Sequence, residues 1–196
     1  MQEQRIAPVL DQFETLDRVD KWCRDQLQRA SADPRSPFRW PILCTAGPLP
    51  RGRVVVLRKF DSESGSLIFY TDQRTEKCRD LAHQDGAECV FFDPKKMIQL
   101  RAQGIARLIS DAGLTEMHFQ RVNDNAKKDY GSKKAPGTVL EEPPCVQSSE
   151  QGSARNFSVI ELRIEAIDWL KLSREGHKRA RLDWVGDGTS NSWIVP

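Results

Sequence analysis

Residues 53–81 decide the fold, and they read RVVVLRKFDSESGSLIFYTDQRTEKCRDL. The β-branched run at 54–57 predicts a strand that is buried on both faces. A second apolar run at 67–70 follows a polar turn at 61–65, so the two runs predict an antiparallel hairpin. Thr75 is of a residue type that begins helices, and we expect a short helix from there to about residue 84.

The flanking segments alternate between helical and strand patterns. Apolar residues three and four apart predict a helix over 15–30, and Asp111 is expected to begin another. Its expected inner face is Leu114, Met117, Arg121 and Val122. The Gly-, Pro- and Ser-rich segment 130–156 is expected to be one long loop bordering a site. Further strands are expected over 88–92, 97–109, 157–172, 177–184 and 192–195. This pattern predicts a mainly β protein, a small antiparallel barrel with flanking helices in one domain over residues 1–196.

The composition argues against several classes of function. A net charge of +2 over 196 residues is too small to indicate nucleic-acid binding. No apolar stretch approaches the roughly 20 residues that cross a bilayer, and the N-terminus lacks the pattern of a secretory signal. The cysteines are five, widely spaced and without a CxxC pair, so we expect reduced thiols, no metal site and a cytoplasmic location. They are Cys23, Cys44, Cys78, Cys89 and Cys145.

Cations and hydroxyls gather around the predicted hairpin and the helix after it. If the hairpin pairs as expected, Arg53 or Arg58 meets the hydroxyls of Thr71 and Thr75 and the ammonium of Lys77. Such groups, together with N–H groups at a helix start, suit a phosphate. The alternative is a set of solvated charges at strand ends.

The same stretch resembles the core of the pyridoxine/pyridoxamine 5′-phosphate oxidase family. That family has an Arg-x-Val-Leu-Leu-Lys strand, a Tyr-Thr strand end and a Ser-Arg-Lys helix start, which hold FMN in a split barrel of Greek-key type. The resemblance implies that the flavin is lined by Arg53, Val56, Leu57 and Arg58. It also implies that the ribityl phosphate is held by Tyr70, Thr71, Thr75 and Lys77. Glu76 stands where the family has a phosphate-binding Arg.

The resemblance extends to later segments. Gln99 matches a family Gln that reaches the flavin from the neighbouring subunit, which implies a homodimer. Trp169 and Arg179 match a Trp and an Arg that close over FMN, and His177 matches an active-site His. Taken singly, Trp169 fits a core position, Gln99 a surface strand and His177 a solvated histidine.

The departures from the family pattern fall on the substrate side. Met117 and Asn125 replace a Tyr and a Ser that grip the substrate phosphate, and Glu175 replaces an Arg. The remaining substrate-side candidates are Arg58, Arg121 and His177, with His177 as the candidate catalytic residue.

The sequence therefore favours an FMN-dependent oxidoreductase that takes a hydride from a small molecule to flavin N5, with the substrate unassigned. One alternative is a genuine pyridoxine/pyridoxamine 5′-phosphate oxidase. Another is a non-catalytic module that binds flavin or haem, in which His118 and His177 would be the axial ligands.

Overall fold

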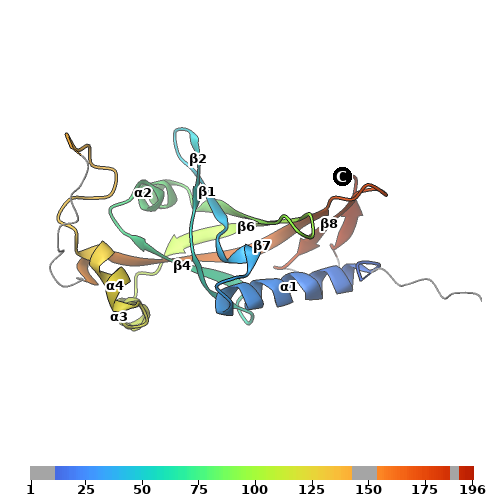
Figure 1. Cartoon of the computed structure of the whole chain (residues 1–196), viewed down its shortest axis with the longest axis horizontal. Coiled ribbons are helices and arrows are strands. Elements are labelled where there is room, and N and C mark those ends of the chain that lie inside the picture. The colour runs from blue at the N-terminus through green and yellow to red at the C-terminus, as the bar shows by residue number, and fades with distance from the viewer. Residues whose placement is uncertain (1–11, 143–153, 186–189) are drawn as a thin grey trace, which may run out of the picture.

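The computed structural model describes residues 12–142, 154–185 and 190–196 (Figure 1). Its strands are β1 (Ile42–Ala46), β2 (Pro50–Val54), β3 (Leu57–Asp61), β4 (Ser66–Asp72), β5 (Gly86–Asp93), β6 (Ile98–Leu108), β7 (Phe157–Lys171), β8 (Lys178–Asp183) and β9 (Ser192–Ile194). Its helices are α1 (Leu16–Ala32), α2 (Glu76–His83), α3 (Ala112–Gln120) and α4 (Asp124–Lys127), with short 3-10 turns η1 (Pro37–Arg39), η2 (Lys128–Gly131) and η3 (Ala154–Asn156).

The strands form one antiparallel sheet that curls on itself. Its order is β2-β1-β5-β6-β7-β4-β3, with β8 on β7 and β9 on β8. β2 and β3 lie at opposite ends of this order, yet only Val55 and Val56 join them. Two edges so closely linked require the sheet to bend round into a barrel. The expected mainly β barrel with flanking helices is confirmed.

The single buried strand expected at 54–57 is wrong. The run divides between β2 and β3, and Val54 at the end of β2 is 62% exposed. The reason is the edge crossing: Val55 leaves β2 and donates its N–H to the carbonyl of Pro41. The expected hairpin is confirmed, because β3 pairs antiparallel with β4.

β7 is the long central strand, and it pairs with β6, β4 and β8. The register of β6 against β7 shifts between Gln103 and Gly104. A Cβ at position 104 would lie 1.9 Å from the carbonyl oxygen of Arg163, so this irregularity needs a glycine. The expected strand over 157–172 is confirmed.

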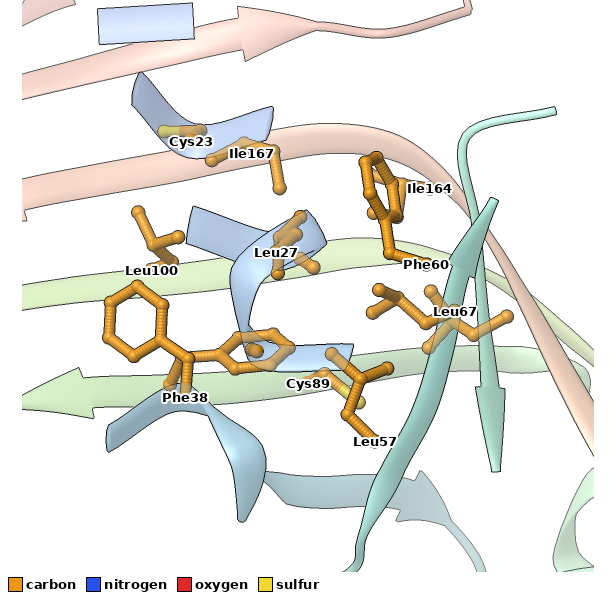
Figure 2. Close-up of a cluster of buried hydrophobic side chains, with 14 of the residues drawn as sticks. Cys23, Leu27, Phe38, Leu57, Phe60, Leu67, Cys89, Leu100, Ile164 and Ile167 are labelled. Carbon is orange, nitrogen blue, oxygen red and sulfur yellow. The ribbon is translucent and has the colours of Figure 1, made fainter. Parts of the chain in front are cut away.

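The main core lies between the barrel and α1 (Figure 2). Thr15 caps α1, and its buried face is Val19, Cys23, Leu27 and Ala30, as the sequence predicted. Phe60, Leu100 and Ile167 from three strands meet this face. Sealing this end of the barrel leaves the outer sheet surfaces and α2 free to carry function.

A smaller apolar cluster covers the other side of β4 and β7. Phe119 of α3 and Val122, which follows the helix, pack there with Phe157 and Val159. The expected inner face of this helix is partly wrong. Leu114, Met117 and Arg121 are exposed, whereas His118 and Phe119 are buried. Residue 121 already lies beyond the last helical turn, so the helical spacing does not extend to it.

The segment 130–156 is less irregular than a single loop, since η2 enters it and η3 ends it. Residues 143–153, with Cys145, lie outside the described residues. The four described cysteines are free thiols. Among the described residues no helix is both long and apolar enough to cross a membrane.

Candidate functional site

The end of β4 and the start of α2 bring together three of the predicted phosphate-binding side chains. The Lys77 ammonium donates to the Thr71 hydroxyl over 3.1 Å. The hydroxyls of Thr71 and Thr75 lie 3.4 Å apart, and Thr75 also donates to the carbonyl of Asp72. Both threonines are buried, so their orientation is fixed by packing as well as by hydrogen bonds. Thr75 begins α2 as expected, although its side chain makes no capping hydrogen bond.

Arg53 on β2 joins this group through a buried carboxylate that the sequence did not single out. Its guanidinium donates to the Thr45 hydroxyl over 2.7 Å, and Thr45 donates to Asp80 Oδ2 over 2.8 Å. A second β2 guanidinium, that of Arg51, donates to Asp80 Oδ1 over 2.8 Å. We call Arg51, Arg53, Thr71, Thr75 and Lys77, with Asp80 behind them, the cradle.

The electrostatics of the cradle favour an anion. Burial lowers the pKa of Lys77, and the nearby Arg53 charge lowers it further. An anion between these cations would pair with them and so offset both the burial of the Lys77 ammonium and its repulsion by Arg53. The chemistry and the fixed placement of the donors therefore fit the phosphate of FMN.

Arg58 and Tyr70, expected at the same site, lie elsewhere. Tyr70 precedes Thr71 on β4, and successive side chains on a strand point to opposite faces. The Tyr70 hydroxyl lies 3.1 Å from Nδ1 of His118, and the Arg58 guanidinium lies 5.2 Å from the centre of the Tyr70 ring. Only Arg53, of the two arginines considered, converges with Thr71 and Lys77.

Arg58, Tyr70, His118 and Arg121 form a second group, which we call the Tyr70 group. Burial lowers the pKa of His118, and the charges of Arg121 and Lys59 lower it further. Burial also raises the pKa of Tyr70. The Nε atom of Arg58 is buried and has no hydrogen-bond partner among the described residues. Met117 and Asn125, at the two substituted family positions, are exposed.

Val56 lies in the link between β2 and β3, and Leu57 begins β3. Leu57 is fully buried in the core, so only its backbone can contact a ligand. Val56 is half-buried.

Gln99 and Arg179 lie on the outer face of the sheet. Gln99 is opposite Leu170, which in turn is opposite Arg179, so their side chains share that face. Arg179 donates to both carboxylate oxygens of Asp168, over 3.0 and 2.6 Å. These interactions orient the guanidinium before any ligand binds.

His177 and Arg179 line a shallow pocket of about 300 Å³. Phe13 and Trp193 supply its apolar wall. The imidazole is exposed, and its Nδ1 accepts the backbone N–H of Ser173 over 3.1 Å. Glu175 is exposed in the turn before β8.

Trp169 lies beneath the His177 pocket, against Phe13 and Trp193, and is not exposed to it, so its expected flavin contact is corrected. Its side chain is fully buried, with the Phe13 ring 4.9 Å away. Trp169 lies opposite Leu100 and Ala180, which places it on the inner face of the sheet, opposite to Arg179. It is a core residue.

The expected site residues thus separate into distant parts. α2 and β8 lie far apart along the long axis of the molecule (Figure 1). The cradle is at α2, whereas His177 and Arg179 are at β8, and one chain does not bring them together. Among the described residues no cluster of His, Cys, Asp or Glu could hold a metal ion.

Arg51 and Asp80 were not predicted from the sequence, and His118 was considered only as a haem ligand. Arg51 is two residues before Arg53, so strand alternation was a usable signal for a shared face. The role of Asp80 could be predicted only if the packing of α2 against β1 was known. His118 followed from helix spacing only once the true inner face was known.

Comparison with known proteins shows similarity to one family. Residues 20–110 match the pyridoxamine 5′-phosphate oxidase FMN-binding domain. The pyridoxine/pyridoxamine 5′-phosphate oxidases of Psychrobacter arcticus and Psychrobacter cryohalolentis are 32% and 31% identical over 110 residues, which is 55% of this chain. The chain spans about half the length of these curated relatives, since the match covers 49% of each.

Solved structures extend the similarity to most of the chain. A pyridoxamine 5′-phosphate oxidase-related, FMN-binding protein from Nostoc punctiforme has a TM-score of 0.71 and 25% identity, covering 90% of this chain and 96% of that protein. PhzG from Burkholderia lata has a TM-score of 0.69 at 18% identity, covering 97% and 100%. The fold is the FMN-binding split barrel of these proteins.

Proposed function

We propose that the chain is a member of the pyridoxamine 5′-phosphate oxidase-like FMN-binding split-barrel family and an FMN-dependent oxidoreductase that acts on a small molecule. The observation that carries the proposal is the cradle. Its buried hydroxyls and cations converge where the family similarity calls for a phosphate. We further propose that residues 1–196 form a single domain.

The chain's own residues bind FMN and orient the substrate. Arg53 and Lys77 hold the phosphate of FMN, with the Thr71 and Thr75 hydroxyls beside it. FMN, when bound, supplies the redox chemistry by accepting a hydride at N5. In the Tyr70 group, Arg58 and Arg121 would attract an anionic substrate. His177 would add a polar group on the substrate side, next to Arg179 and Gln99.

A homodimer accounts for the separation of the site's parts. The outer sheet face that carries Gln99 also exposes apolar side chains. Ile42 is opposite Val54, and Phe92 is opposite Gln99. The exposed fractions are 42% for Ile42, 62% for Val54 and 43% for Phe92. An apolar surface beside unfinished ligand-binding groups supports a two-fold interface. Gln99 and Arg179 of one chain would then complete the cradle of the other.

The first test identifies the cofactor. The purified protein is denatured, and the released chromophore is identified by its visible spectrum and chromatography. We expect FMN rather than FAD, because the cations converge on one phosphate. Release of FAD alone, or a Soret band in the native protein, would contradict the proposal; so would failure of added FMN to bind. A haem-binding module is the reading that a Soret band would favour.

The second test asks whether two chains share the site. Lys77→Gln and Arg179→Gln should each weaken FMN binding. In a mixture of the two variants after subunit exchange, half of the dimers are mixed, and each has one intact site, so about a quarter of all sites recover. If both residues served one site within a single chain, mixing would restore nothing. A monomer in sedimentation that binds FMN tightly would also exclude the shared site.

A further inference from the structure

Arg51 belongs to the cradle, but the function proposed above assigns the phosphate of FMN to Arg53 and Lys77 and gives Arg51 no ligand. Its guanidinium donates to Asp80 Oδ1 over 2.8 Å and lies 3.8 Å from the Glu76 carboxylate. It therefore stands over the first turn of α2, next to residue 77. About a third of the side chain is exposed, so N–H groups that Asp80 does not take remain open to a ligand.

Asp80 fixes Arg51 and Arg53 on one side of β2. The two arginines are two residues apart on that strand, so their side chains share a face. Arg51 binds Oδ1 of Asp80, and the guanidinium of Arg53 lies 3.6 Å from Oδ2. One carboxylate thus sets the positions of two guanidinium groups.

The surroundings are shaped for this arrangement. Asp80 is only 4% exposed, and a buried carboxylate requires paired charges. At Gly47 a Cβ would lie 2.7 Å from Asp80 Oδ1 and 3.1 Å from the Arg51 guanidinium. The missing side chain at position 47 therefore leaves the space that the ion pair fills.

The charge balance leaves positive charge for a ligand. Arg51 and Arg53 face the buried carboxylate of Asp80, and the third cation, Lys77, lies near Arg53 and Asp72. Glu76 is the other acid in contact with Arg51, and its side chain is 59% exposed, so water screens it. Asp72 is already bound by Arg74. An entering phosphate would meet a net positive site with guanidinium groups already oriented.

We propose that Arg51 binds the phosphate of FMN from β2, and that Asp80 is the positioning residue that holds Arg51 and Arg53 for this contact. The proposal rests on the FMN-binding function above and extends it to two residues of this chain. It also accounts for Glu76: the guanidinium arrives from the neighbouring strand, so position 76 need not supply it.

The test separates the phosphate from the rest of the flavin. FMN and riboflavin are titrated into the apoprotein, and their affinities are compared for the native protein, Arg51→Gln and Arg51→Lys. Arg51→Gln should weaken FMN binding about 10- to 100-fold and leave riboflavin binding unchanged. Arg51→Lys keeps the charge but loses the planar fork, so its effect should be smaller. Arg79→Gln, an exposed cation of α2, is the control and should change neither affinity.

Two further variants keep the test decisive. Asp80→Asn should weaken FMN binding while sparing riboflavin, which a purely structural role would not do. In the double variant Arg51→Gln with Glu76→Arg, FMN affinity should be recovered in part, because a guanidinium returns to the same place. If Arg51→Gln binds FMN as the native protein does, the inference is wrong although the proposed function stands. If the native protein itself does not bind FMN, the proposed function fails first.

Discussion

The cradle and the Tyr70 group lie on opposite faces of the same strand, and they differ in how far their polar atoms are satisfied. In the cradle, Thr71, Lys77 and Asp80 are hydrogen-bonded to one another or to close neighbours. In the Tyr70 group, the buried Nε of Arg58 has no partner among the described residues. The cradle holds its donors in place before a ligand arrives, whereas the Tyr70 group retains a buried donor without a partner.

This difference separates cofactor binding from substrate choice. The cradle retains the features of an FMN-binding family, and its one substitution, Glu76, lies beside Arg51. On the proposed substrate side, Met117, Asn125 and Glu175 stand where the resemblance implies three phosphate-binding groups. A site can keep its cofactor and change its substrate when different residues control the two.

The largest expected effect concerns the substrate side. We expect oxidation of pyridoxine or pyridoxamine 5′-phosphate to be weak, because Met117, Asn125 and Glu175 cannot bind the substrate phosphate as the family residues do. Each lost contact is worth about 1.5–3 kcal/mol, so kcat/KM should fall by two or more orders of magnitude even without full additivity. Steady-state turnover of both compounds under air measures this.

Turnover of either vitamin phosphate at about 10⁴ M⁻¹s⁻¹ or faster would overturn this prediction and favour a genuine oxidase. Glu175→Arg sharpens the comparison, since it returns a cation beside His177 without touching the cradle. It should raise turnover of the vitamin phosphates and leave FMN affinity unchanged.

The next effect contrasts one cation from each region. Lys77→Gln should weaken FMN binding about 10- to 100-fold through loss of a charge-assisted contact. Arg121→Gln, the matched change in the Tyr70 group, should leave FMN affinity close to that of the native protein. Fluorescence quenching of FMN during titration measures both. Equal losses in the two variants would mean that the two regions are not separate in function.

The sequence was sufficient for the part of the cradle that short-range patterns control. A hairpin followed at once by a helix places Thr71, Thr75 and Lys77 together with little dependence on the rest of the chain. The same reasoning located α1, β4 and β7. Local pattern and tertiary packing agree in these segments, so one sequence is enough to predict them.

The sequence was insufficient where long-range geometry decides. The run at 54–57 has strand propensity throughout, and only closure of the barrel divides it at Val55. Trp169 matched a ligand position by spacing, yet the alternation of β7 turns it into the core. Asp80 could not be predicted, because the partners of this buried helical residue lie on two strands, β1 and β2, that are distant in the sequence.

Trp169 supplies the third prediction, since it should belong to neither region. Trp169→Phe should lower the free energy of unfolding by about 1–2 kcal/mol through lost packing against Phe13. Removing the unpaired buried Nε1 atom offsets part of that loss. FMN affinity should not change. Chemical denaturation and FMN titration of the same variant give both numbers, and a loss of affinity without a loss of stability would restore Trp169 to the flavin site.

The smallest expected effect is a pH dependence that arises in the Tyr70 group alone. Burial, Arg121 and Lys59 lower the pKa of His118 below its ordinary value of 6.5. Below that value the unfolded chain binds a proton at this residue while the folded protein does not. Stability contributed by His118 is therefore present above pH 6.5 and declines as the pH falls through it.

His118→Gln should lose less stability than the native protein between about pH 7.5 and about pH 5.5. His83→Gln, a change at an exposed histidine of α2, should behave like the native protein. Urea unfolding at the two pH values measures the difference. If His118→Gln and the native protein lose equal stability, the pH dependence arises outside the Tyr70 group, and the contrast between the two faces of β4 does not extend to protonation.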